Sequence, residues 1–180
     1  MSAGSAAQTV ETQRLVLRRW CSGDAAALAA INADPEVMRY IGDGRPLSRR
    51  SSDDLLWWFE HEWDTRGFGL WAVEEDGGLV GFCGLTVPMF LPEVLPAVEI
   101  GWRLGRDAWG RGLATEAARA ALRLGFDELR MAEIIAIVNP ANARSLRVGA
   151  KLGMTARPSR LHPVSRTRLT VLGARPSRLH

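Results

Sequence analysis

The segment 98–117 combines an apolar strand pattern, a Gly/Arg turn and the start of an Ala-rich helix. Gly110 and Gly112 let the backbone turn sharply and approach a ligand closely. The first turn of a helix presents unpaired N–H groups and the positive end of a dipole, which together attract anions. Arg106 and Arg111 add positive charge beside that turn. The sequence therefore predicts that a phosphate-bearing ligand docks here.

Glu99 is the first candidate for acid–base chemistry. It lies in the strand pattern 98–104, where alternation puts it on one face with Gly101 and Arg103. A carboxylate in a central strand is costly unless it is paired or functional. Burial would raise its pKa and suit it to act as a general base. The alternative is a structural pair with Arg103, two positions further along the same face.

The segment 139–145 is the third candidate element. Its Asn-Pro pair breaks a strand, and Asn142 is a good helix N-cap. Ser145 lies three residues further on, on the same side of the helix as Asn142. Spacing alone favours a capping pair at these two positions.

The window 109–114, Trp-Gly-Arg-Gly-Leu-Ala, resembles the pyrophosphate loop of the GNAT superfamily of acetyl-CoA-dependent N-acetyltransferases. That loop reads Gln or Arg, two residues, Gly, one residue, then Gly or Ala. Trp109 departs from the usual first position, as is common in the branch resembling RimJ and RimL, which acetylate the N-termini of ribosomal proteins. The resemblance runs over about residues 12–172, and the N-x-x-N-x-x-S pattern at 139–145 belongs to it.

The resemblance implies an acyltransferase that moves the acetyl group of acetyl-CoA directly to a primary amine, with no metal. It implies that Glu99 removes a proton from the amine, usually through water. Many relatives place a general-acid Tyr near the sulfur, but the single tyrosine here, Tyr40, lies far away in sequence, so Ser145 is the candidate that protonates the thiolate. The backbone at 102–104 of a bulged, splayed central strand would pair with the pantetheine arm. The residues implied to bind the co-substrate are Trp102, Arg103, Leu104, Trp109, Gly110, Arg111, Gly112, Leu113, Ala114, Thr115, Asn139 and Asn142.

The acceptor side is less clearly encoded. The family places it between the two N-terminal helices and the loop 87–97. Residues that could line it, unless they are ordinary core, are Met38, Tyr40, Trp58, Trp71 and Met89. Apolar walls favour a small or extended peptide N-terminus. The acidic side of the helix expected at 48–66 keeps a polycationic aminoglycoside open as an acceptor.

Hydrophobic periodicity predicts the elements that position these residues. Strands are expected at 14–20, 70–73, 79–83, 98–104, 133–138 and 168–172. Helices are expected from Ser22 or Asp24 to about Asp34, from Ser48 to about Arg66 with Gly67 as its stop, at 113–128 and at 142–152. With the resemblance, this predicts an α/β (α+β) GNAT fold: a mixed, mostly antiparallel sheet of six to seven strands, splayed at the central strand and flanked by helices.

No linker divides the sequence. We expect a flexible N-terminus at 1–11, a single N-acetyltransferase domain at 12–172 and a C-terminal tail at 173–180. The heptapeptide A-R-P-S-R-L-H occurs twice, at 156–162 and 174–180, and neither copy is assigned a function.

Composition is that of an ordinary globular protein, with 180 residues of which 47% are hydrophobic and 24% charged. No apolar run approaches the roughly 18 residues that cross a bilayer, and no signal-peptide pattern is visible. Cys21 and Cys83 give neither a disulfide framework nor a metal-ligand spacing. The cytoplasm is the expected location.

Charge is distributed unevenly along the chain. The last acidic residue is Glu133, and the rest of the chain carries eight Arg, one Lys and no acid. This asymmetry suggests a polyanionic partner. The phosphates of CoA are the nearest candidate and ribosomal RNA is a second, whereas solvated basic loops are the alternative.

The functions that remain open differ in class. The leading one is transfer of an acetyl group to a primary amine, with a protein or peptide N-terminus as the acceptor. Alternatives are an aminoglycoside or other small amine as acceptor, a CoA-binding sensor without turnover, and a ribosome-associated module that uses the basic C-terminal part. The resembling branch commonly forms homodimers.

Overall fold

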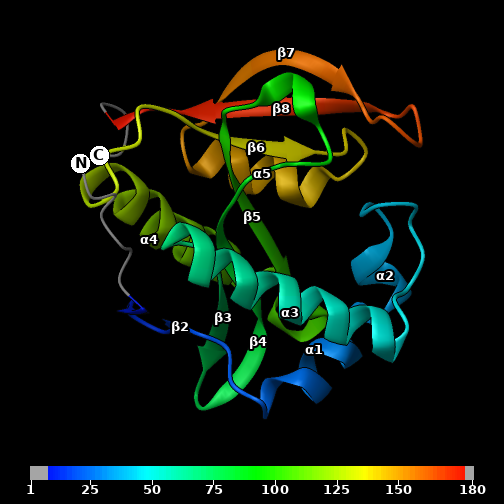
Figure 1. Cartoon of the computed structure of the whole chain (residues 1–180), viewed down its shortest axis with the longest axis vertical. Coiled ribbons are helices and arrows are strands. Elements are labelled where there is room, and N and C mark those ends of the chain that lie inside the picture. Colours follow the sequence, from blue (N-terminus) through cyan, green and yellow to red (C-terminus); the bar gives the residue numbers. More distant parts are fainter. Residues whose placement is uncertain (1–7, 177–180) are drawn as a thin grey trace.

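One mixed sheet of eight strands organises the protein, and its strand order is β1-β2-β3-β4-β5-β6-β8-β7 (Figure 1). The computed structural model describes residues 8–176. All neighbouring strands pair antiparallel except β5 and β6, which run parallel. The strands are β1 Thr9–Glu11, β2 Val16–Arg18, β3 Leu70–Glu75, β4 Gly78–Thr86, β5 Val98–Leu104, β6 Ile134–Val138, β7 Thr155–Leu161 and β8 Arg168–Ala174.

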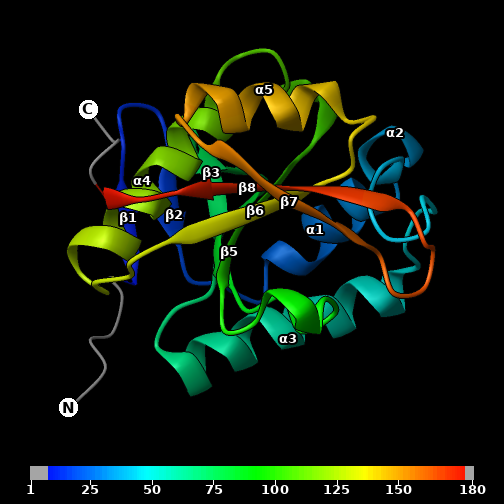
Figure 2. The same ribbon diagram turned by 90° about the horizontal axis from the view of Figure 1, so that it is seen from above.

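Helices cover both faces of this sheet (Figure 2). They are α1 Asp24–Asn32, α2 Pro35–Met38, α3 Arg49–Arg66, α4 Leu113–Asp127 and α5 Ala143–Lys151. Strand alternation divides the core accordingly. Phe82 of β4 packs in a cluster with Leu28 of α1 and Phe59 of α3. Cys83 and its neighbours on the opposite face pack in a larger cluster that includes the apolar side of α4.

Local capping sets the bounds of α3. The Ser48 side chain accepts a hydrogen bond from the backbone N–H of Ser51, and Gly67 ends the helix with φ of 74°. Both were predicted. The predicted cap of α1 by Ser22 or Asp24 is wrong, because Gly23 is the N-cap and makes no side-chain cap bond. Asp24 instead turns its carboxylate toward Arg18 of β2 and the backbone N–H of Cys21.

Strands β1 and β7 account for the difference between the predicted six to seven strands and the observed eight. Within the segment expected to be flexible, 1–11, residues Thr9–Glu11 pair with β2, and residues 1–7 lie outside the described part. The first heptapeptide copy forms most of β7, whose register with β8 shifts between Arg157 and Arg160. This irregularity hides the alternation that would reveal a strand. Strand β8 continues to Ala174, and residues 177–180 of the second copy are not described.

The splay that the resemblance implied is present between β5 and β6. These strands pair only at Val98↔Ile134 and Glu99↔Ile135, so the rest of β5 has no partner on that side. The implied bulge is absent, because β5 keeps a continuous register with β4 as far as Leu104↔Gly81. A continuous register leaves no extra residue to accommodate. Among the described residues, no helix is both long and apolar enough to cross a membrane.

A buried ion pair ties α1 to the sheet, and its loss should be costly. Burial alone would raise the pKa of Asp24, but hydrogen bonds from Arg18 and Cys21 outweigh it and hold that pKa below its usual value. Asp24→Asn is expected to destabilise the fold by about 1–3 kcal/mol at pH 7, because it removes one of the two carboxylates that neutralise the Arg18 guanidinium and leaves only Glu74. The difference should shrink as the pH falls through the folded-state pKa of Asp24. Urea unfolding at several pH values measures both effects.

The matched control is Asp53→Asn, which breaks the exposed Arg49–Asp53 pair on α3. That change is expected to cost about 0.5 kcal/mol or less. Equal destabilisation by the two substitutions would contradict the role given to Asp24.

Candidate active site

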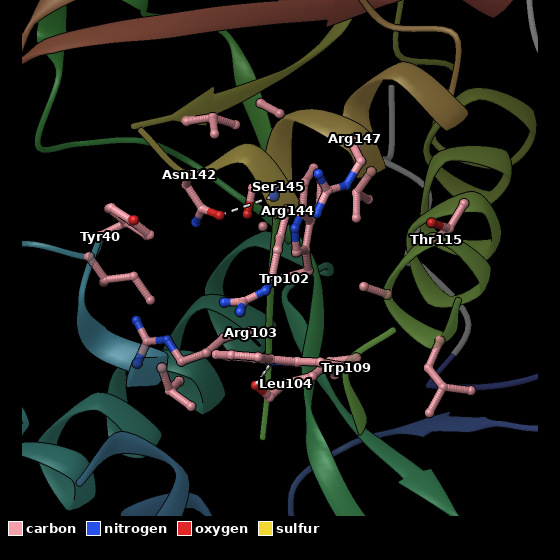
Figure 3. A pocket seen from close by; sticks show the side chains of 18 of the residues that line it. Tyr40, Trp102, Arg103, Leu104, Trp109, Thr115, Asn142, Arg144, Ser145 and Arg147 are labelled. Carbon is pink, nitrogen blue, oxygen red and sulfur yellow. Dashed lines mark hydrogen bonds between the residues drawn. The ribbon is translucent and has the colours of Figure 1, made fainter. Parts of the chain in front are cut away.

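A cavity of about 410 Å³ lies where β5 and β6 diverge. Its walls come from β5, β6, the start of α4, α5 and α2, which are far apart in the sequence (Figure 3). Of the residues predicted to be catalytic or to bind the co-substrate, every one except Arg111 lines this cavity. They are Glu99, Trp102, Arg103, Leu104, Trp109, Gly110, Gly112, Leu113, Ala114, Thr115, Asn139, Asn142 and Ser145.

The N-terminus of α4 forms one end of the cavity. Gly110 and Gly112 have φ of 73° and 82°, a conformation in which a side chain would be strained. Gly112 is the N-cap and makes no side-chain cap bond. The first backbone N–H groups of α4 therefore remain free to bind an anion.

The arginines of this turn do not supply free charge. Arg106 Nε lies 2.6 Å from a carboxylate oxygen of Asp34, and Arg111 forms two hydrogen bonds of 2.7 Å with Glu75. Arg14 Nη1 also donates to the Arg111 carbonyl at 2.9 Å. The prediction that both arginines add positive charge to the anion site is thus wrong, because long-range partners neutralise them. Arg111 instead anchors the turn.

Positive charge comes from α5 instead. Arg144, Arg147 and Lys151 line the cavity and form no salt bridge within residues 8–176. Sequence reasoning missed this set, although the spacing of three and four residues places them on one side of a helix. The Arg144 guanidinium lies 4.2 Å from the centroid of the Trp109 ring, and Trp109 Nε1 donates to the Leu104 carbonyl at 2.8 Å (Figure 3). Trp109 thus joins the turn to the end of β5 and holds Arg144 over the cavity.

Glu99 is half-buried and is the last residue of β5 that pairs with β6. Burial raises the pKa of its carboxyl to about 8; the backbone of Ile137 opposes this rise and the nearby Glu62 adds to it. The structural pair with Arg103 that the sequence left open is absent from the described residues, because Arg103 turns toward Asn32. Within residues 8–176, Glu99 therefore presents to the cavity a carboxyl that has no ion-pair partner.

Asn142 and Ser145 combine the two interpretations that their spacing allowed. Asn142 Oδ1 accepts a hydrogen bond from the Ser145 backbone N–H at 3.1 Å, which is the predicted cap. Both residues also line the cavity. Asn139 similarly uses its Oδ1 to accept from the backbone of Ala141. The Ser145 hydroxyl makes no hydrogen bond within the described part of the chain.

Of the five residues predicted to line the acceptor side, only Tyr40 lines the cavity. Met38 and Trp71 are buried in the core, whereas Trp58 is 56% exposed and Met89 62% exposed. The wall beside Tyr40 is made by Glu36, Val37 and Ile41 at and just after α2. Nothing in the local pattern of α2 indicates this placement, since it depends on where the helix packs.

The chain matches the model of the acetyltransferase (GNAT) domain family over residues 14–155. The protein YkkB of Bacillus subtilis (strain 168) is 35% identical over 146 residues, which cover 79% of this chain and 83% of YkkB. A crystal structure of an acetyltransferase from Agrobacterium tumefaciens is similar with a TM-score of 0.80 at 27% identity, and the match covers 94% of this chain and 95% of that one.

The structure of RimL, a ribosomal L7/L12 α-N-protein acetyltransferase in complex with coenzyme A, has the same fold. Its TM-score is 0.77 at 11% identity, with 93% of this chain and 97% of that one covered. The family match, the similarity to YkkB and the common fold confirm the resemblance at the level of the superfamily. The chain belongs to the GNAT acetyltransferase family and is an N-acetyltransferase.

Proposed function

We propose that this chain transfers the acetyl group of acetyl-CoA directly to a primary amine, with Glu99 as the general base. One observation carries the proposal: a carboxyl that forms no salt bridge with the described residues, and whose pKa is raised to about 8, shares a cavity with a free helix N-terminus. A base whose pKa lies near the working pH is ionised in a large fraction of the molecules and is still strong enough to accept a proton.

The cavity suits the chemistry of coenzyme A. Beyond Glu99, β5 has no strand partner on its β6 side, so the backbone groups of 102–104 on that edge can bind an extended amide chain. The free N–H groups of α4 and the cations of α5 suit phosphates. Acetyl-CoA supplies the acetyl thioester when it is bound.

The residues of the cavity divide the proton transfers between them. Glu99 takes the proton that the amine nitrogen loses as its bond to the acetyl carbon forms. Ser145 donates a proton to the sulfur as the carbon–sulfur bond breaks. Tyr40 lies in the same cavity and is a second candidate for this donor.

The charges and position of α3 favour a peptide N-terminus over a polycationic aminoglycoside as the acceptor. Four carboxylates of α3 are already paired: Asp53 with Arg49, Glu60 and Asp64 with Arg19, and Glu62 with Arg66. No residue of α3 lines the cavity. The fold itself does not separate the two acceptors, because RimL and an aminoglycoside acetyltransferase share it. On the charge argument we propose that the chain is a member of the RimJ/RimL-like branch.

A thiol-release assay with acetyl-CoA and a panel of short peptides, polyamines, amino acids and aminoglycosides tests this function. Turnover should be highest with peptides. Turnover on aminoglycosides alone would overturn the choice of acceptor. Tight CoA binding with no turnover on any amine would favour the sensor.

Removing the cations of α5 should weaken CoA binding. The double substitution Arg144→Gln and Arg147→Gln is expected to raise the Kd of CoA about 10- to 100-fold at low salt, because charge-assisted contacts to phosphate are lost. The difference from wild type should shrink as salt increases. Isothermal titration calorimetry at two salt concentrations measures it. The matched control is Arg106→Gln, whose partner is Asp34; an equal effect of the control would contradict the prediction.

A further inference from the structure

Arg103 is charged, lines the cavity and has no counter-ion among the described residues. Its Nη1 donates to the Asn32 Oδ1 at 2.6 Å, and its guanidinium lies 4.9 Å from the centroid of the Phe82 ring. Its Nε is buried and has no hydrogen-bond partner. Within residues 8–176 it forms no salt bridge, unlike Arg106 and Arg111 of the turn before α4.

A guanidinium that is largely removed from water and has no counter-ion is unfavourable for folding. The guanidinium stays protonated in proteins, so it cannot escape the cost by losing its charge. Burial lowers the pKa of Arg103 to about 10, which reflects that cost. Neither an amide oxygen nor the face of an aromatic ring carries a full negative charge. A charge left in this state at an enzyme site indicates that its counter-ion arrives with a ligand.

Buried polar residues of α1 and α3 also hold the Arg103 side chain in position. Asn32 and Ser52 are fully buried, and Asn32 Nδ2 donates to the Ser52 hydroxyl at 2.8 Å. Because the guanidinium can only donate, the Asn32 oxygen faces Arg103 and its Nδ2 faces Ser52. Two buried polar side chains from α1 and α3 therefore orient one cavity arginine. Such preorganisation is typical of a binding residue.

The Arg103 side chain points away from the end of the cavity where the N-terminus of α4 would bind phosphates. In Figure 3, Arg103 points away from Thr115 on α4 and toward the side where Tyr40 lies. Strand alternation puts Arg103 on the same face of β5 as Glu99. Four residues of strand separate the two Cα atoms by about 13 Å.

We propose that Arg103 binds a carboxylate of the acceptor, so that the preferred substrate is a peptide whose amine and carboxylate are separated by a residue or so. This rests on the proposed function, in which Glu99 deprotonates the amine. The distance along β5 favours a peptide with an acidic residue beside its N-terminus, or a very short peptide with a free C-terminus, over a free α-amino acid. The guanidinium would form a paired hydrogen bond with the carboxylate and satisfy its buried Nε.

Matched peptides test the proposal. Ser-Glu-Ala-amide and Ser-Gln-Ala-amide differ in one charge, and Ser-Gln-Ala with a free C-terminus tests the second source of a carboxylate. Wild-type kcat/KM is expected to be about 10- to 100-fold higher for a peptide with a carboxylate than for Ser-Gln-Ala-amide. In Arg103→Gln the ratio should fall to about 1. Arg106→Gln is the matched control and should keep the wild-type ratio.

Arg103→Met is the second variant, because its side chain keeps an apolar contact with Phe82 and removes the buried charge. Both variants should unfold at or above the wild-type temperature, which excludes a folding defect. An absence of preference in the wild type would overturn the proposal. A higher KM for acetyl-CoA together with a preserved peptide preference would overturn it too, since Arg103 would then bind the co-substrate.

Binding of the acetylated product tests the carboxylate site at Arg103 independently of the proposal that Glu99 is the general base. Calorimetry in the presence of CoA compares N-acetyl-Ser-Glu-Ala-amide with its glutamine counterpart and needs no turnover. A preference for the glutamate product that Arg103→Gln abolishes supports the carboxylate site even if Glu99 proves not to be the base. Equal binding of the two products contradicts it, whatever the turnover.

Discussion

Glu99→Gln is expected to lower kcat/KM for the acceptor by about 100- to 10,000-fold, the contribution typical of a positioned general base. Glutamine keeps the shape of the side chain and cannot accept the proton. The affinity for CoA should stay within about twofold, because the phosphate end of the cavity is built by α4 and α5. Thiol release measures the first quantity, and calorimetry with CoA measures the second.

The pH dependence follows from the raised pKa of Glu99, which is about 8. The base must be ionised, so wild-type kcat/KM should rise with pH and level off above about pH 8. The profile should be measured with an acceptor whose amine has a pKa well below 6, because that amine stays neutral over the measured range and only the enzyme titrates. With that acceptor, Glu99→Gln should show a flat profile.

Stability provides the control for this substitution. The folded-state pKa of Glu99 lies above its unfolded value, so the stability of the wild type declines as the pH rises from the unfolded pKa through about 8. Glu99→Gln should therefore gain stability relative to wild type between pH 5 and pH 9. A variant that is well folded, binds CoA and turns over at the wild-type rate would show that Glu99 is not the base.

Gly81→Ala is expected to destabilise the fold by about 2–4 kcal/mol, because the new methyl group has no space. Gly81 has φ of 150°, and a Cβ there would lie 2.2 Å from the Arg103 carbonyl oxygen and 2.7 Å from the Leu104 Cα. Both contacts are backbone atoms of β5, which cannot move aside as the end of a side chain could. The substitution should thus also displace the strand that carries Glu99 and lower turnover.

The matched control lies in the same strand. A Cβ at Gly78 would meet only the Glu75 carbonyl oxygen at 3.6 Å, an ordinary contact. Gly78→Ala is expected to change stability by about 1 kcal/mol or less. Urea unfolding of both variants measures the comparison, and equal stabilities would refute the close approach of β4 and β5.

Several helix ends and turns of the fold could be predicted from residues that are neighbours in the sequence. The ends of α3 follow from Ser48 and Gly67, and the sharp turn before α4 follows from Gly110 and Gly112. These features depend on neighbours in sequence, through caps and allowed φ angles, so their residues predict them directly. The strands β1 and β7 escaped prediction because one is very short and the other has an irregular register.

Charge pairing was decided by the tertiary structure. Arg106 and Arg111 look like free cations in the sequence, yet Asp34 and Glu75 neutralise them. Arg144 and Arg147 of α5 line the cavity and form no salt bridge within the part of the chain that the structure describes. Tyr40 reaches the same cavity from a distant part of the chain. A sequence states which groups are charged but not which of them meet.

The sequence by itself therefore determined the superfamily, the anion-binding turn and the position of Glu99 on its strand. The tertiary structure decided that Glu99 forms no ion pair with any described residue and that Arg103 turns to Asn32 instead. The reason is physical: strand periodicity and glycine conformations act over a few residues, whereas burial and ion pairing depend on segments that only packing brings together.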